Sequence, residues 1–214
     1  MKKVFRFFAI AAIACGMTMA VSCNKDDNGE NGGNGGNGGG GNTENLPTTI
    51  DENFDNGMPS GWTSIDADGD GYEWVSFDES FFGDQGVEFF GNGTNCMLSA
   101  SYINGVGALS TDNYLVMPKV YIEDGATLSY QIASYQLQYA DSYQVVIGTL
   151  ANGTFTVSET LLTEETTGGI SDGNGLVLRS IDLSAYKGQS LYIAFRHNCE
   201  DCYWLVLDDV KITK

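Results

Sequence analysis

From Ile50 to the end, the chain alternates short runs rich in Val, Ile, Tyr, Phe and Thr with turns marked by glycine. These runs lack the 3.6-residue period of an amphipathic helix, and β-branched and aromatic residues favour strands. The turn dipeptides are Asn56-Gly57, Asp124-Gly125, Asn152-Gly153, Gly168-Gly169 and Lys187-Gly188. The alternation predicts an all-β fold.

The clearest predicted strands cover residues 126–133, 142–150, 176–182, 190–196 and 203–213. Between residues 128 and 132, apolar and polar side chains alternate, as in a strand with one face on a core and the other in water. With only three prolines in the chain, a two-sheet antiparallel sandwich is the predicted architecture, and a closed barrel is the alternative.

The first residues resemble a lipoprotein signal peptide. Three basic residues stand among the first six positions, before an apolar run over 7–21 that is too short to span a bilayer comfortably. Small or apolar residues at 20–22 precede Cys23, as in a lipobox. We expect residues 1–22 to be removed and Cys23 to carry the lipid. A soluble secreted protein, cut at a nearby small residue, is the alternative.

Residues 23–47 form the predicted linker between the lipid and a folded domain at 48–214. Positions 28–43 are almost entirely Gly and Asn, too poor in apolar surface to offset the entropy of ordering. The short segment 24–27 resembles the acidic tag that sends some Gram-negative lipoproteins to the outer face of the outer membrane. We therefore expect a lipid-anchored, surface-exposed protein of the outer membrane.

The charge restricts the partners. The formal net charge is −18, and three basic residues with no acidic one precede Cys23, so the chain without them carries −21. Such a protein repels nucleic acid and anionic headgroups. The folded part is large enough for one core, and we expect a monomer.

An acidic loop begins at Asp66, where carboxylates alternate with glycines. Asp66, Asp68 and Asp70 with the Tyr72 carbonyl supply oxygens at positions one, three, five and seven of a calcium loop. Position twelve, which needs a bidentate Glu in an EF-hand, is Phe77, and the flanks are typical of strands. The pattern predicts a Ca²⁺ site that is not an EF-hand; a solvated acidic turn is the alternative.

Three cysteines fall in the folded part: Cys96, Cys199 and Cys202. The C-x-x-C spacing suits redox chemistry or zinc, but zinc needs two further ligands and His197 is the sole histidine. We expect a local Cys199–Cys202 disulfide, with Cys96 as a buried thiol. A bridge from Cys96 to one of the other two is the alternative.

Four segments in order, at 52–71, 109–118, 192–197 and 207–212, resemble the cleaved adhesin domain of gingipains and haemagglutinins, also called choice-of-anchor J. The resemblance implies a jelly-roll β-sandwich related to galactose-binding and MAM-type modules, with structural calcium. The chain lacks the protease domain and the module arrays of those proteins, so their proteolytic activity is not carried over.

The resemblance also implies site residues. A first ion would use Asp66, Asp68, Asp70 and the Tyr72 carbonyl, and a second would use Asp55, Asp112, Asp208 and Asp209. Adjacent strand residues point to opposite faces, so Asp208 and Asp209 cannot both reach one ion through side chains alone. A turn role for Asp112 is the alternative.

The sequence favours binding over catalysis. No Gly-x-Ser-x-Gly elbow follows a strand, and His197 is expected to be structural. Aromatic-rich stretches at 72–90 and 130–143 supply rings that stack on sugars or anchor protein partners, unless they only fill the core. We expect a non-catalytic, adhesin-like surface lipoprotein that binds host protein or glycan, through residues the sequence leaves open. The alternatives are accessory glycan capture for polysaccharide uptake, a structural envelope role and, less favoured, a hydrolase.

Overall fold

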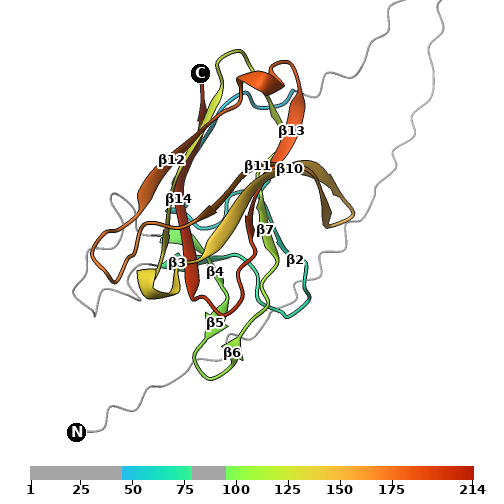
Figure 1. Cartoon of the computed structure of the whole chain (residues 1–214). Coiled ribbons are helices and arrows are strands. Elements are labelled where there is room, and N and C mark those ends of the chain that lie inside the picture. The colour runs from blue at the N-terminus through green and yellow to red at the C-terminus, as the bar shows by residue number, and fades with distance from the viewer. Residues whose placement is uncertain (1–44, 79–94) are drawn as a thin grey trace, which may run out of the picture. The chain divides into compact units, whose positions relative to one another are not determined.

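The computed structural model describes residues 45–78 and 95–214, which are built mostly from β-strands (Figure 1). Expectations about the signal peptide, Cys23, the Gly/Asn-rich segment and the rings at 81–90 lie outside the described residues. In the part that is described, no helix is long and apolar enough to cross a membrane.

Within residues 45–78 and 95–214, the strands form two six-stranded sheets and one small hairpin. The first sheet contains, in spatial order, β12 (Val177–Asp182), β9 (Thr127–Ser134), β14 (Trp204–Thr213), β4 (Asn95–Ala100) and β3 (Val75–Asp78), with β1 (Ile50–Glu52) beside β14. The second contains β11 (Thr154–Glu165), β10 (Ser142–Ala151), β13 (Ser190–His197), β7 (Asn113–Val116) and β2 (Thr63–Asp66), with β8 (Val120–Tyr121) beside β13. The hairpin pairs β5 (Tyr102–Ile103) with β6 (Gly107–Ala108), and the short 3₁₀ turns are η1 (Leu137–Tyr139) and η2 (Ser184–Tyr186).

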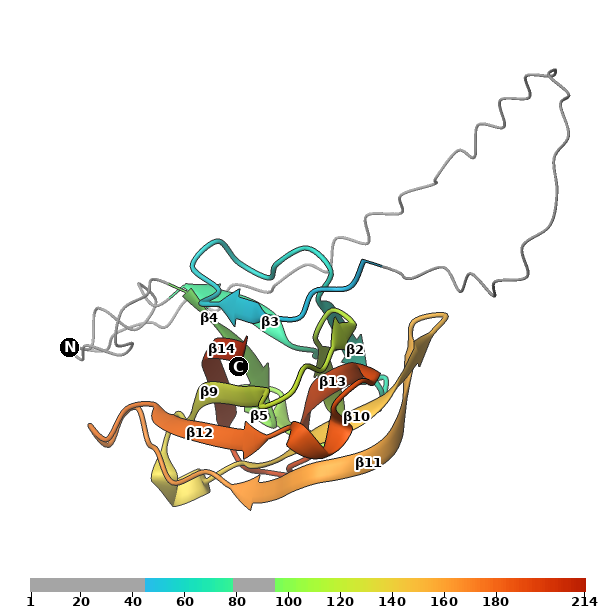
Figure 2. The same ribbon diagram turned by 90° about the horizontal axis from the view of Figure 1, so that it is seen from above.

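The predicted antiparallel jelly-roll sandwich is confirmed, and the closed barrel is wrong because the described strands form two separate layers. Figure 2 looks down on these layers, with β9, β12 and β14 in one and β10, β11 and β13 in the other. Every pair of named strands is antiparallel. The sequence-predicted strands correspond to β9, β10, β12, β13 and β14, with ends that differ by one residue.

The core lies between the sheets. On β9, Leu128, Tyr130 and Ile132 are buried and alternate with half-buried polar residues, as the sequence pattern predicted. They pack with inward-facing residues of the second sheet, including Phe195. The ring centroids of Tyr130 and Phe195 are 4.9 Å apart, in an edge-on contact. Burial of these large side chains is the main favourable contribution to folding.

The first described strand runs beside the last one. Ile50 pairs with Ile212 and Glu52 with Val210, so β1 lies along the final residues of β14. Just before β1, the carbonyl oxygen of Pro47 accepts a hydrogen bond from the backbone N–H of Tyr121 at 2.9 Å. The N-terminal start of the sandwich is therefore fixed at the end where β14 finishes and β13 begins.

Two buried tyrosines face each other across the core. The hydroxyl oxygens of Tyr130 and Tyr143 are 3.1 Å apart. Burial raises the pKa of both phenols, that of Tyr143 to about 12. The fold therefore favours their neutral forms. The resulting stabilisation is complete below the unfolded pKa of about 10 and is lost as the pH rises through the folded values.

We expect Tyr143→Phe to flatten the decline of the unfolding free energy between pH 10 and about 12, because one fewer proton is then released on unfolding. Urea titrations across that range measure the slope. Tyr121→Phe is the matched control, because Tyr121 is 41% exposed and lies outside the core. An unchanged slope in Tyr143→Phe would contradict the linkage.

Candidate functional site

The acidic loop follows β2 and brings its three carboxylates together. Asp66, Asp68 and Asp70 each place a carboxylate oxygen within 4.8 Å of the others. The backbone N–H groups of Gly69 and Gly71 donate to Asp66 at 2.7 and 2.8 Å. Both glycines have φ near +80°, at +78° and +88°, a conformation that L side chains rarely adopt. The glycines thus let the backbone curl around the carboxylates.

The loop carries the chemistry of a hard-cation site. Its carboxylates are half-buried at Asp66 and exposed at Asp68 and Asp70. Partial burial raises the pKa of Asp70 above its ordinary value, and the negative charges of Asp68 and Asp66 raise it further. A divalent cation would relieve that repulsion, and clustered carboxylate oxygens suit Ca²⁺. Calcium binding here, with the Tyr72 carbonyl as a further ligand, stays a prediction.

Asp112 lies beside this loop. Its backbone N–H donates to the Asp68 carboxylate at 2.5 Å, and its carbonyl oxygen accepts from the N–H of Ala67 at 3.0 Å. Its carboxylate accepts two hydrogen bonds from the guanidinium of Arg196, at 2.6 and 3.0 Å. Arg196 also lies 5.3 Å from the ring centroid of Tyr114. Asp112 therefore holds the acidic loop against the second sheet.

The other three residues predicted for a second ion lie elsewhere. Asp208 and Asp209 belong to β14 in the first sheet, and the carbonyl oxygen of Asp55 accepts from the side chain of Asn95 at the start of β4. Among the described residues, no three of these predicted carboxylates, Asp112 included, come close enough to hold one ion. The structure does not bring Asp112 together with the rest.

A β-bulge separates the two adjacent aspartates. The register with β9 shifts between Asp208 and Lys211, and Asp209 has φ of +48°. Asp208 is buried and accepts the backbone N–H of Asp209 at 2.7 Å. The Asp209 carboxylate instead accepts from Gln131 at 2.7 Å and lies 3.8 Å from Lys211. A metal role for Asp55, Asp208 and Asp209 stays a prediction.

The end of the sandwich that holds the acidic loop also holds a group of aromatic rings, here called the aromatic cluster. Tyr203 is its central residue, and the rings around it are those of Tyr102, Tyr135, Tyr139 and Trp204. Tyr203 stacks on Trp204, with centroids 4.9 Å apart and planes at 10°. Its centroid lies 5.4 Å from Tyr135, 6.2 Å from Tyr102 and 6.4 Å from Tyr139. Tyr139 is 45% exposed, and Tyr102 and Tyr203 are half-buried.

Sequence reasoning found part of this cluster. The stretch 130–143 pointed to Tyr135 and Tyr139, whereas Tyr102 and Tyr203 were missed because they are far apart in sequence. The adjacent aromatic pair at 203–204, at the start of the strand predicted over 203–213, was the available signal. The stretch 72–90 is only partly described, and in it Trp74 is a core residue with 1% exposure.

Strand register explains why the acidic loop and the aromatic cluster share one end. Asp66 pairs with Asn113, and Asn113 pairs with His197 at the end of β13. The loop after β13 is held by the backbone N–H of Thr111, which donates to the carbonyl oxygen of Cys199 at 3.3 Å. That loop leads directly into the aromatic cluster.

The same loop contains a disulfide. Cys199 and Cys202 are bridged in the structure, three positions apart, as the sequence predicted. Asp201, between them, has φ of +53°, which an aspartate tolerates. Cys96 is a fully buried thiol whose sulfur lies 3.8 Å from the carbonyl oxygen of Phe77. The bridge constrains the chain immediately before Tyr203.

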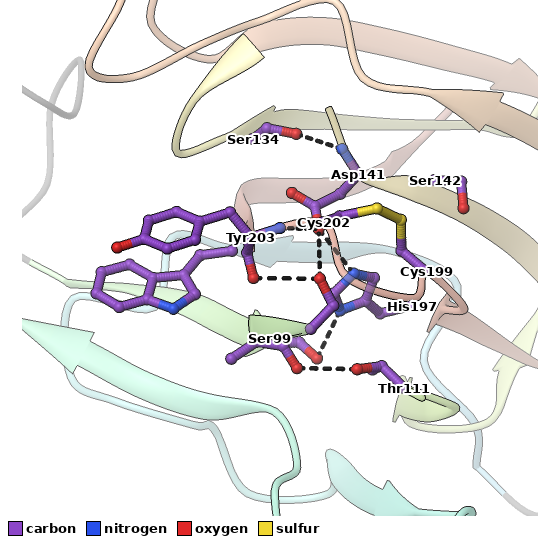
Figure 3. Close-up of polar contacts among 12 residues, drawn as sticks. Ser99, Thr111, Ser134, Asp141, Ser142, His197, Cys199, Cys202 and Tyr203 are labelled. Atoms are coloured by element: carbon purple, nitrogen blue, oxygen red, sulfur yellow. Dashed lines mark hydrogen bonds and ion pairs between the residues drawn. A yellow bond between two sulfur atoms is a disulfide. The ribbon is translucent and has the colours of Figure 1, made fainter. Parts of the chain in front are cut away.

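Beneath the aromatic cluster lies a buried polar network (Figure 3). The two ring nitrogens of His197 lie 2.9 Å from Ser99 Oγ and 3.1 Å from Asp141 Oδ1. Ser99, Asp141 and His197 are all 0% exposed. A nucleophile must reach its substrate, so this serine–histidine–aspartate set fits a structural role, as predicted for His197.

The network also holds the backbone of Tyr203, the central residue of the aromatic cluster. Asp141 Oδ1 accepts from the N–H of Tyr203 at 3.3 Å and from the hydroxyl of Ser101 at 3.2 Å. The carbonyl oxygen of Tyr203 accepts from the N–H groups of Ser101 and Tyr102 at 2.8 and 3.3 Å. Both backbone groups of Tyr203 are thus held.

Comparison with known proteins identifies relatives. The model of the Cleaved Adhesin Domain family matches residues 47–212. Hemagglutinin A of Porphyromonas gingivalis is 35% identical over 176 residues, which cover 77% of this chain and 8% of that protein. Lys-gingipain W83 of the same species is 34% identical over 178 residues, covering 77% and 10%. The chain therefore spans a tenth or less of these relatives.

Solved structures agree in fold. The K1 cleaved adhesin domain of Lys-gingipain from P. gingivalis W83 has a TM-score of 0.64 and 30% identity, covering 78% of this chain and 98% of that one. A structure of TmCBM61 in complex with β-1,4-galactotriose has a TM-score of 0.50 and 11% identity, covering 76% and 94%. The second likeness supports the fold alone.

His197→Ala should lower the unfolding free energy by about 3 kcal/mol, because it leaves the buried Asp141 without its imidazole partner. Urea denaturation measures the loss. His197→Gln is the control, since an amide can still bond Asp141 and should retain part of the stability. Equal stability of His197→Ala and the parent would contradict a structural role.

Proposed function

Since the chain belongs to the cleaved adhesin domain family, we propose that it is a calcium-stabilised, non-catalytic binding domain that recognises host protein or glycan at the cell surface. One observation carries the proposal. The clustered carboxylates of Asp66, Asp68 and Asp70 and the partly exposed aromatic cluster lie at the same end of the sandwich. Loops at such ends are common binding surfaces because a rigid scaffold positions them.

Calcium would stiffen this end. An ion held by Asp68 would sit next to the hydrogen bond that joins Asp68 to the backbone of Asp112. Asp112 in turn is paired with Arg196 of β13. Without an ion, the acidic loop is held mainly by hydrogen bonds to its own carboxylates. The proposed role of the ion is therefore to make this loop rigid.

Two arguments support a non-catalytic role. One relative is named Protease PrtH, but the matching family model describes the adhesin domain, and the chain covers 16% of that relative and 10% of Lys-gingipain W83. In addition, the serine–histidine–aspartate set is fully buried. The proposal therefore includes no proteolytic activity.

A lipid on Cys23 would anchor the domain to the outer membrane, with residues 24–47 as the tether. With that anchor, the exposed rings also fit a second candidate function, glycan capture for a neighbouring uptake system. A glycan array and a binding assay on immobilised matrix proteins, each run with and without Ca²⁺, separate the two functions. Binding to one polysaccharide class supports capture, and binding to matrix proteins such as fibrinogen supports adhesion.

Calcium removal should lower the melting temperature of the mature chain, made soluble by Cys23→Ser. At a Ca²⁺ concentration of about 100 times Kd, linkage gives about 3 kcal/mol, or roughly 5–10 °C, which EDTA should abolish. Asp68→Ala with Asp70→Ala should remove most of this difference. Asp124→Ala, at an exposed turn aspartate, should retain it. A melting temperature that EDTA leaves unchanged would refute the calcium assignment.

Cys23→Ser should move the protein from the membrane fraction to the soluble fraction, because it removes the acylated thiol. Fractionation of expressing cells measures the shift, and Cys96→Ser serves as a control because Cys96 is a buried thiol of the domain. If Cys23→Ser remains in membranes, the lipid anchor is wrong.

A further inference from the structure

We propose that the aromatic cluster is a stacking surface for a neutral pyranose glycan, with Tyr139 and Tyr203 as its principal contacts. The inference rests on the proposed function as a binding domain, and it names the ligand class and the face. Four rings have centroids within 6.4 Å of the Tyr203 ring centroid at this end, and Tyr139 is 45% exposed. Large aromatic side chains gathered at a surface are a recognised mark of binding sites.

The flat faces of these aromatic rings suit stacking against a sugar ring. Tyr203 stacks on Trp204 with nearly parallel planes, at 10°, and centroids 4.9 Å apart, so a sugar can reach only the faces that the two rings turn away from each other. An aromatic face carries partial negative charge, and the C–H groups on one side of a pyranose ring are weakly positive. A sugar ring can therefore lie flat on a phenol face, and Tyr139 offers the most exposed one in the cluster.

Neutral polar groups border the rings. The side-chain amide of Asn104 donates to the hydroxyl of Tyr203 at 3.3 Å, and that of Gln138 donates to the hydroxyl of Tyr139 at 3.2 Å. Amides and phenols both donate and accept hydrogen bonds. They therefore match sugar hydroxyls, which do the same.

Charge selects neutral glycans over acidic ones. Glu200 and Asp201, in the loop that precedes Tyr203, are exposed, and the whole chain has a formal charge of −18. Uronic acids and sulfated sugars would meet repulsion at this face. A neutral oligosaccharide would not.

The surface is held in place before any ligand arrives. The backbone of Tyr203 is bound on both sides by Asp141 and Ser101, and the disulfide of Cys202 lies one residue earlier. The indole N–H of Trp204 donates to the carbonyl oxygen of Tyr102 at 3.1 Å. Ordering of side chains on binding costs affinity. A surface whose residues are already held in place by these bonds therefore favours binding.

The acidic loop lies within reach of this surface through backbone contacts. The backbone N–H of Ala67 donates to the carbonyl oxygen of Asp112. The backbone N–H of Thr111, which precedes Asp112, donates to the carbonyl oxygen of Cys199. Chelation should therefore weaken glycan binding even though no carboxylate of the loop belongs to the cluster. Calcium would act by positioning the loop that carries Tyr203.

The test uses the mature chain with Cys23→Ser, titrated by calorimetry with neutral hexasaccharides of glucose, mannose, xylose and galactose, with polygalacturonate as the acidic counterpart. We expect one neutral series to bind and polygalacturonate to bind at least tenfold more weakly. Tyr139→Ala should weaken binding at least tenfold, whereas Tyr139→Phe, which keeps the ring, should change it by less than threefold. Tyr121→Ala is the matched control, an exposed tyrosine at the opposite end of β13.

The outcomes separate this inference from the proposed function. If the chain binds glycan or fibrinogen and Tyr139→Ala leaves that binding unchanged, the aromatic cluster is not the binding surface, while the proposed binding function still holds. Fibrinogen binding that Tyr139→Ala abolishes, without glycan binding, overturns the ligand class. Failure to bind any glycan or matrix protein overturns both. Melting curves for each variant confirm folding, and Tyr139 carries the test because it is the most exposed ring of the cluster.

Discussion

The hydrogen bonds of one buried imidazole join the two layers of the sandwich. His197 ends β13 in the second sheet, and its ring bonds Ser99 of β4 in the first sheet and Asp141 just before β10. Burial of a carboxylate away from water costs free energy unless the group is paired and hydrogen-bonded. One oxygen of the Asp141 carboxylate, Oδ1, lies 3.1 Å from the His197 ring and also accepts the backbone N–H of Tyr203. The rigidity of the proposed binding end depends on this pair.

Much of the fold could be predicted because its signals are local. Alternation along a strand identified β9, β10, β12, β13 and β14, and aspartate spacing identified the acidic loop, since both patterns concern residues a few positions apart. The C-x-x-C bridge is local in the same sense. Loop carboxylates that bond backbone N–H groups two to five residues away need no knowledge of the tertiary fold.

The remaining features depend on contacts between distant positions. His197 meets Ser99 across 98 positions, and Asp112 meets Arg196 across 84. No spacing rule predicts such pairs. The resemblance grouped Asp112 with the aspartates of β14, while its place beside Asp68 follows from the register of β2 and β7. Likewise, the left-handed backbone at Asp209 depends on a register shift that only the paired strands define.

The pairing of β1 with the final residues of β14 gives the domain a direction. Ile50 lies opposite Ile212, whereas Trp204, at the start of β14, belongs to the aromatic cluster about 25 Å away by strand rise. A chain that enters the sandwich at Pro47 is thus joined at one pole, and the rings and carboxylates occupy the other. The entry of the chain at Pro47 and the proposed binding surface therefore lie at opposite ends of the sandwich, so a change in the length of the chain before Pro47 would alter neither the rings nor the carboxylates.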